Sequence, residues 1–222
     1  MTNKGGVLKL SPAKELVIWF PLVVPYLFYF VWKDRLPERV PSHYGINGEA
    51  DAFMAPFELL IFMTVIGVFV SALLMAAPFI DPKKSNYLYF EGFYFFIRLF
   101  MTLLLSSIVI MSMAIGLGYS IPVDRIISVA VLGLMLVLGN YMTKVRTNFF
   151  VGIRTPWTLS NEEVWRKTHR LAGRLLVSTS LLSLAVLFFL PSSTFVFLLF
   201  GTIGIGLIYP TIRSYFWYKS MK

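Results

Sequence analysis

The longest stretch of this sequence without a charged side chain is LLVSTSLLSLAVLFFLPSSTFVFLLFGTIGIGLIYPTI, from Leu175 to Ile212. As a single helix it would be nearly twice as long as the hydrocarbon core of a bilayer is thick, because about 20 helical residues cross that core. A Pro-Ser-Ser sequence at 191–193 lies near its middle and favours a turn. The stretch therefore predicts two membrane-spanning helices, at 175–190 and 194–212.

Four further uncharged stretches have about the length that a spanning helix needs: Leu16–Trp32, Leu59–Ile80, Leu99–Val123 and Ile126–Thr143. Pro21 and Pro25 are expected to kink the first of them. Overall, 57% of the residues are hydrophobic and 14% are charged, against about 25% charged in globular domains. A water-soluble enzyme or nucleic-acid-binding protein could not hide so much apolar surface. The predicted fold class is all-α: a polytopic membrane protein with six transmembrane helices.

The spans divide the chain into two expected parts. Residues 1–80 would hold the first two spans and an extracytoplasmic loop at 33–58. Residues 81–222 would hold four further spans and a cytoplasmic loop at 144–174. Because the spans themselves contain no charged side chain, we expect function to lie in these two loops.

Lysine and arginine are distributed unevenly between the two sides of the membrane. The side with both tails and the 144–174 loop holds fourteen of them, against four on the other side. Cytoplasmic loops carry such an excess, so both termini are expected in the cytoplasm. The same rule accounts for the net charge of +9 without nucleic acid. Arg98 and Arg174 lie at span edges, where long side chains are expected to snorkel to the interface.

Several kinds of chemistry are excluded by composition. The chain has no cysteine, and its two histidines, His43 and His169, are predicted on opposite sides of the membrane. They cannot share a metal ion or form one catalytic pair, and we expect neither a metal nor a cofactor. The six uncharged stretches contain no ionisable Asp, Glu, Lys, Arg or His. This disfavours an ion-coupled transporter, although a passive pathway stays open.

The first long loop contains LPERVPSHYGINGEAD, from Leu36 to Asp51. Its two prolines favour extended backbone, and Asn47-Gly48 predicts a tight turn. His43, Glu49 and Asp51 are candidates for a metal or acid–base site, but their spacing matches no standard ligand pattern. A hydrogen-bonded structural loop and a ligand-recognition loop are the alternatives. Ligand recognition suits the loop better than catalysis.

The second long loop contains NFFVGIRTPWTLSNEEVWRKTHRLAG, from Asn148 to Gly173. Ser160 followed by Glu163 predicts a capping box and a short helix that starts at Asn161. Trp165 and His169 would share one face of that helix. Two interpretations stay open: a helix lying in the membrane interface with its tryptophan at headgroup level, or a docking surface for a cytoplasmic protein.

The string GIRTPWTLSNEEVWRKTHRLAG, Gly152–Gly173, resembles the signature of the SdpI family of bacterial immunity proteins. LPERVPSHYGINGEAD resembles the segment that accompanies that signature. The resemblance implies a protein of the bacterial plasma membrane that protects the cell against a secreted toxic peptide. For some members it also implies that the toxin-loaded protein holds a cytoplasmic repressor at the membrane.

The leading hypothesis is thus a non-enzymatic immunity protein whose partners are a secreted toxic peptide, a cytoplasmic repressor and the lipid bilayer, without direct nucleic-acid contact. The alternatives are a small transporter exporting toxic peptides or lipophilic compounds and, third, a membrane enzyme using His43 and Asp51. The residues expected to bind the ligand are Arg39, His43, Tyr44, Glu49 and Asp51. Those expected to contact the inner partner are Arg154, Trp157, Trp165, Arg166, His169 and Arg170.

Overall fold

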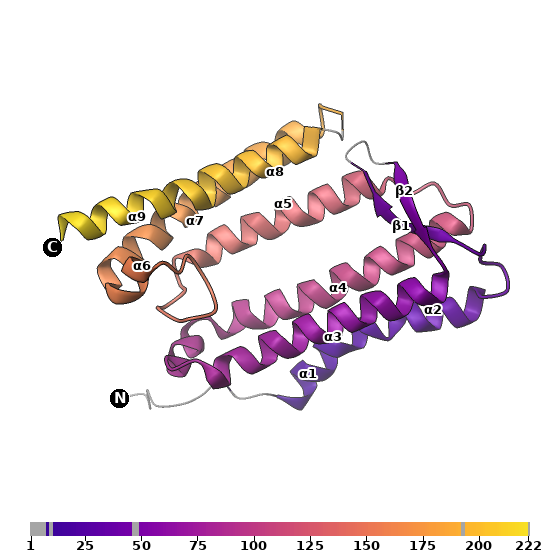
Figure 1. The fold of residues 1–222 in the computed structure, drawn as a ribbon, viewed down its shortest axis with the longest axis horizontal. Coiled ribbons are helices and arrows are strands. Elements are labelled where there is room, and N and C mark those ends of the chain that lie inside the picture. The colour runs from indigo at the N-terminus through magenta and orange to yellow at the C-terminus, as the bar shows by residue number, and fades with distance from the viewer. Residues whose placement is uncertain (1–7, 9–10, 46–48, 192–193, 222) are drawn as a thin grey trace. The chain divides into compact units, whose positions relative to one another are not determined.

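The computed structural model describes residues 8, 11–45, 49–191 and 194–221. Within these residues, six helices are long and apolar enough to cross a membrane (Figure 1). The predicted all-α membrane fold and its number of spans are therefore confirmed. The six spans are Pro12–Trp32, Pro56–Ile80, Lys84–Gly116, Val123–Met142, Glu162–Leu187 and Phe195–Ser220.

The first span is kinked, as its prolines predicted. It consists of α1 (Pro12–Trp19), a 3-10 turn (Phe20–Leu22) and α2 (Val24–Trp32). Pro25 has no amide hydrogen to donate to the carbonyl of Pro21, four residues earlier. The hydroxyl of Ser106 on α4 (Glu91–Gly116) donates to that carbonyl at 2.7 Å. The backbone carbonyl that the kink leaves without a helical partner is therefore satisfied inside the protein.

The middle spans begin earlier than the uncharged stretches do. They are α3 (Pro56–Ile80), a 3-10 segment η2 (Lys84–Phe90) that leads into α4, and α5 (Val123–Met142). Because α4 already begins at Glu91, Arg98 lies two turns inside the helix and not at its edge. A helix continues through charged residues where its packing supports it. The nearest charged residue therefore marks the limit of the apolar stretch and not the limit of the helix.

The fifth span corrects the prediction for the 144–174 loop. After a short α6 (Pro156–Ser160), α7 runs without a break over Glu162–Leu187. The expected short helix is thus the first part of a spanning helix. The expected Ser160–Glu163 capping box is also wrong, because the N-cap is Asn161, whose side-chain oxygen accepts the amides of Glu163 and Val164 at 2.9 and 3.1 Å. The capping box lies on α6, between Thr155 and Thr158.

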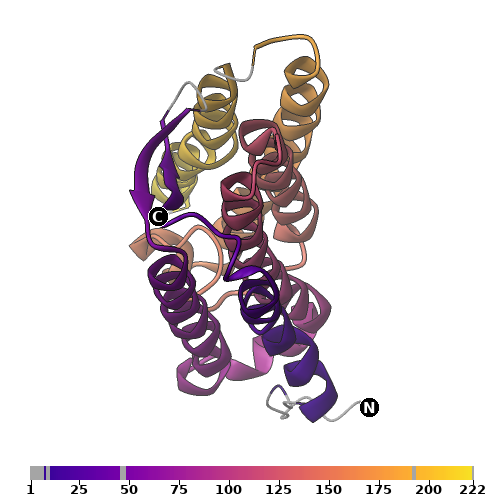
Figure 2. The ribbon, with the colours of Figure 1, turned by 90° about the vertical axis from the view of Figure 1, so that its right-hand side faces the viewer.

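The sixth span is α8 (Phe195–Ile203), a π-helical turn η4 (Gly204–Ile208) and α9 (Tyr209–Ser220). It lies alongside α7, as both views show (Figures 1 and 2). The predicted turn between the fifth and sixth spans involves Ser192 and Ser193, which lie outside the described residues.

The first long loop forms a small antiparallel hairpin that the sequence did not predict. Strand β1 (Val40–Tyr44) pairs with β2 (Ala50–Met54), with register irregularities around His43. The amide of Gly45 donates to the carbonyl of Glu49 at 2.9 Å and closes the loop. The predicted turn at Asn47-Gly48 lies outside the described residues. We call the described residues of Val40–Met54 the hairpin.

The helices fall into two compact units, each with its own core. Among the described residues, one unit contains 8, 77–91, 127–191 and 194–221, and the other contains 11–45, 49–76 and 92–126. The core of the first unit is formed by Met142, Ile153, Ala172 and Leu176. The core of the second is formed by Leu60, Val109 and Met113. The hairpin belongs to the second unit, and the signature segment, Gly152–Gly173, to the first.

Candidate functional site

The hairpin is fixed to its unit through β1. Val40 is fully buried, and the hydroxyl of Ser112 on α4 donates to the carbonyl of Pro41. At Gly116, near the end of α4, an added Cβ would lie 2.6 Å from a methyl carbon of Val40. The close packing of β1 on α4 leaves β2 as the outer strand. Three consecutive β2 residues, Asp51, Ala52 and Phe53, are exposed.

The hairpin brings two of the predicted ligand-binding side chains together. His43 Nδ1 lies 2.5 Å from Asp51 Oδ1, across the two strands, and 69% and 53% of these side chains are exposed. Glu49 and Arg39 are also exposed on this loop. In the part of the chain that the structure describes, no three His, Cys, Asp or Glu side chains are grouped to hold a metal ion. Glu49 therefore does not complete a ligand set with His43 and Asp51.

Tyr44, the last residue of β1, behaves differently from its neighbours. Its hydroxyl is buried and has no hydrogen-bond partner among the described residues. Burial raises the pKa of Tyr44 above its ordinary value, because the phenolate is poorly solvated there. The hairpin thus has an exposed His–Asp pair and, next to His43 in the chain, a neutral phenol whose buried donor has no partner among the described residues.

The signature segment is held together by His169, which is 1% exposed. Its Nε2 accepts the amide of Ile153 at 3.1 Å, and its Nδ1 donates to the carbonyl of Trp165 at 2.9 Å. This pattern requires the neutral imidazole with its proton on Nδ1. Gly152 has a φ of 108°, and a Cβ there would lie 2.3 Å from His169 Nε2. Glycine is needed at this position both for its backbone conformation and for its closeness to the ring.

The tryptophans of the signature segment also serve packing. Trp165 is 3% exposed, stacks on His169 with 3.9 Å between ring centroids, and donates from Nε1 to the carbonyl of Val145 at 2.9 Å. The ring of Trp165 is therefore covered by protein and does not serve as the lipid-facing anchor of an interfacial helix. Trp157 on α6 donates from Nε1 to Ser214 Oγ on α9 at 2.6 Å. Trp157 therefore joins α6 to α9, and Trp165 joins α7 to the loop that follows α5.

Residues that the sequence analysis missed fix the loop between α5 and α6. Asp81 is 2% exposed, and its Oδ2 accepts the hydroxyl of Tyr87 at 3.0 Å and the amide of Phe149 at 2.8 Å. Asn86 donates to the carbonyl of Thr147 at 2.6 Å. The only sequence signal was the position of Asp81 directly after an apolar stretch. A carboxylate that is buried at such a position needs several hydrogen-bond donors.

The cationic members of the predicted inner site remain at the surface. Arg154, Arg166 and Arg170 are exposed, whereas Trp165 and His169 are buried and Trp157 is half-buried. Arg166 and Arg170 line a cleft of about 750 Å³ that also contains Lys144 and Arg146. We call it the basic cleft. The predicted partner-binding residues therefore divide into two groups: the ring side chains, which support the fold, and the arginines, which are exposed.

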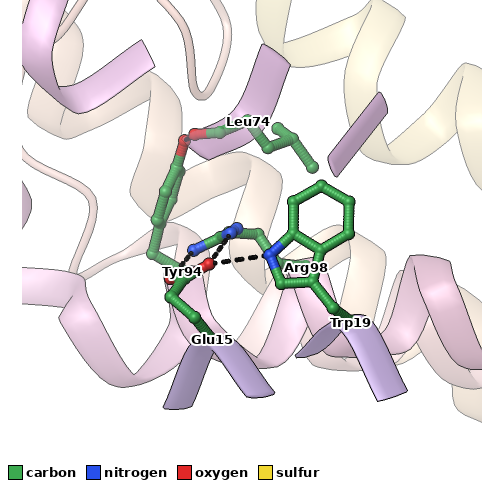
Figure 3. A network of polar contacts seen from close by, with 5 residues as sticks. All are labelled: Glu15, Trp19, Leu74, Tyr94 and Arg98. Carbon is green, nitrogen blue, oxygen red and sulfur yellow. Dashed lines mark hydrogen bonds and ion pairs between the residues drawn. The ribbon is translucent and has the colours of Figure 1, made fainter. Parts of the chain in front are cut away.

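A buried ion pair lies within the other unit (Figure 3). Arg98 of α4 is 3% exposed and donates from both terminal nitrogens to the two carboxylate oxygens of Glu15 on α1, each at 2.7 Å. Trp19 donates to the same carboxylate at 3.1 Å, and the hydroxyl of nearby Tyr94 donates to the carbonyl of Leu74. The expectation that Arg98 snorkels to the interface is therefore wrong, because its partner lies inside the protein.

Comparison with known proteins gives a consistent result. Residues 144–214 match the SdpI/YfhL protein family, and residues 16–68 match a domain of unknown function (DUF1648). The chain is 26% identical over 209 residues to the immunity protein SdpI of Bacillus subtilis (strain 168), covering 94% of this chain and 98% of that protein. No solved structure matches the chain. The two matched regions contain the signature segment and the hairpin, the two motifs on which the predicted resemblance rested.

Proposed function

We propose that this chain, which belongs to the SdpI/YfhL protein family, is a membrane immunity protein that protects its cell against a secreted toxic peptide. The observation that carries the proposal is the similarity to an immunity protein along nearly the whole chain. That similarity includes both the spanning helices and the hairpin, so it is not limited to a shared membrane-protein composition.

The hairpin is the part of the chain best suited to meet such a peptide. We place it on the extracytoplasmic side, because the opposite side holds most of the lysine and arginine. The hairpin offers an exposed His43–Asp51 pair and an exposed Phe53 on β2. Polar and aromatic groups at one place allow a peptide to be bound by hydrogen bonds and apolar contact together.

We further propose that the basic surface of the signature segment recruits a cytoplasmic repressor. Arg166 and Arg170 are exposed one helical turn apart on α7, with the buried His169 and Trp165 beneath them. A rigid support of this kind lowers the ordering cost of binding, and surface charges steer association with an acidic partner.

The proposed immunity is tested by deleting the gene from its source strain. The deletion strain should become sensitive to the peptide fraction of its parent's culture medium, and a plasmid copy should restore resistance. If the deletion strain grows as the parent does under toxin-producing conditions, the proposed function is wrong.

The proposed recruitment is tested separately with Arg166→Glu/Arg170→Glu. Co-purification of the repressor should fall while resistance survives, because the two functions use opposite sides of the membrane. Arg213→Glu/Lys219→Glu on α9 is the matched control, since it reverses two exposed charges elsewhere in the same unit. Equal loss of recruitment in both variants would show that net charge alone matters. Loss of resistance in the first variant at normal protein level would assign the signature segment to immunity itself.

A further inference from the structure

The basic cleft carries more positive charge than its own carboxylates neutralise. Lys144, Arg146, Arg166 and Arg170 line it together with Glu162 and Glu163. Glu163 forms an ion pair with Lys167 at 2.8 Å, and Lys167 does not line the cleft. Within the described part of the chain, none of the four lining cations forms an ion pair with a carboxylate.

The cations are placed so that they repel one another. Arg166 and Arg170 are four residues apart on α7, a spacing at which like charges destabilise a helix. Lys144 and Arg146 face the same cleft from the loop that follows α5. Four cations around the basic cleft are stabilised when an anion binds between them.

The loop that contributes Lys144 and Arg146 is fixed before any ligand binds. Trp165 donates to the carbonyl of Val145, and Asn86 donates to that of Thr147. The guanidinium of Arg146 lies over the ring of Tyr89, with 4.7 Å between its central carbon and the ring centroid. The lysine nitrogen of Lys144 lies 4.8 Å from the ring centroid of Tyr141. Binding therefore requires little ordering of the backbone around the cleft.

The lining chemistry favours a phosphate. The guanidinium group matches phosphate oxygens with two parallel N–H donors, and three of the four cations are arginines. The residues that line the cleft come from the segments where α5 ends and α7 begins. These two helix ends lie at the same end of their unit (Figure 1). Basic pockets between spanning helices on the cytoplasmic side hold the headgroups of anionic lipids.

We infer that the basic cleft binds the phosphate of an anionic phospholipid headgroup from the cytoplasmic leaflet. The inference goes beyond the proposed immunity function and does not depend on it. It gives the four cations a common ligand, and it explains why a loop carrying two of them is held by Asp81, Asn86 and Trp165. The same chemistry would accept free phosphate, so the test must separate the two sources.

The test measures ligand-induced thermal stabilisation of the purified full chain in detergent micelles. Phosphatidylglycerol, phosphatidylcholine and inorganic phosphate are titrated separately, because a ligand that binds only the folded state raises the melting temperature. Phosphatidylglycerol should stabilise the chain in a saturable manner, and the other two should have little effect. Stabilisation by inorganic phosphate equal to that by phosphatidylglycerol would overturn the assignment to a lipid.

The decisive variant is Lys144→Gln/Arg146→Gln, which leaves Arg166 and Arg170 in place for the recruitment test. Losing two surface cations should weaken the apparent affinity for phosphatidylglycerol about 30-fold. Arg213→Gln/Lys219→Gln removes the same charge outside the cleft and should change it less than about 3-fold. Equal affinities in wild type and the cleft variant, or equal losses in the two double variants, would overturn the inference.

Three further variants keep the test decisive if the double variant does not fold. Lys144→Arg/Arg146→Lys retains both charges and should bind within about 3-fold of wild type. The single variants Lys144→Gln and Arg146→Gln should each lose about 5-fold. Single variants that fold and bind as wild type does would refute the site as surely as the double variant.

Discussion

Replacing Arg98 by alanine should destabilise the protein strongly, although the sequence gives no sign that this arginine differs from Arg174. Both stand at the edge of an uncharged stretch. In the structure Arg98 is 3% exposed and makes two 2.7 Å hydrogen bonds to Glu15, whereas Arg174 is exposed on α7. Removing one partner of a buried pair leaves the other charge unpaired, at a cost of about 3–5 kcal/mol.

The lower part of that range applies here. The side chain of Glu15 is 19% exposed, so water can partly solvate its carboxylate once Arg98 is gone. Trp19 also continues to donate to it. We therefore expect Arg98→Ala to lower the free energy of unfolding by about 3 kcal/mol. Arg174→Ala, the matched control, should change it by less than about 0.5 kcal/mol, as exposed substitutions do.

The double variant Glu15→Leu/Arg98→Met provides the second control. It removes both charges and keeps similar side-chain volumes, so its stability should be within about 1 kcal/mol of wild type. Unfolding by titration with sodium dodecyl sulfate in mixed micelles, followed by tryptophan fluorescence, measures all three variants. A loss below about 1 kcal/mol for Arg98→Ala, or a double variant less stable than it, would refute the reasoning from burial.

Two other predictions test the packing of the signature segment and the orientation. Gly152→Ala should destabilise the protein by about 2 kcal/mol, because the φ of Gly152 is 108° and the new methyl would lie 2.3 Å from His169. The control is Gly92→Ala, in an open part of α4. It should be neutral or stabilise the protein by up to about 1 kcal/mol in the same unfolding titration. A membrane-impermeant thiol reagent should label Ala52→Cys and not Ser160→Cys in intact cells, and the reverse pattern would place the termini outside. The chain has no cysteine of its own, so each label reports one site.

The sequence predicted the spans well because their determinants are local. A stretch without charge long enough for the bilayer, and prolines such as Pro21 and Pro25, act on the backbone near themselves. The number of spans and the kink in the first one follow from such features. The family resemblance was likewise carried by contiguous motifs, and the comparisons agree with it.

The errors have a common physical cause, which is that burial depends on distant partners. Arg98 is inside its unit because Glu15, 83 positions away, pairs with it. Helical periodicity placed Trp165 and His169 on one face but could not show that Val145 and Ile153 cover that face. The hairpin was missed because a two-stranded sheet with an irregular register, stabilised by its packing on α4, leaves a weak sequence pattern.

The central claim, immunity through the hairpin, is tested most directly by a killing assay on the deletion strain. The strain carries either the wild-type chain or His43→Ala/Asp51→Ala/Phe53→Ser, and membrane levels of both proteins are matched by immunoblot. All three side chains are exposed, so their replacement should leave the fold intact. We predict that wild type restores resistance to the peptide fraction and that the triple variant leaves the cells sensitive. Full resistance with the triple variant would contradict the claim that the hairpin meets the toxin.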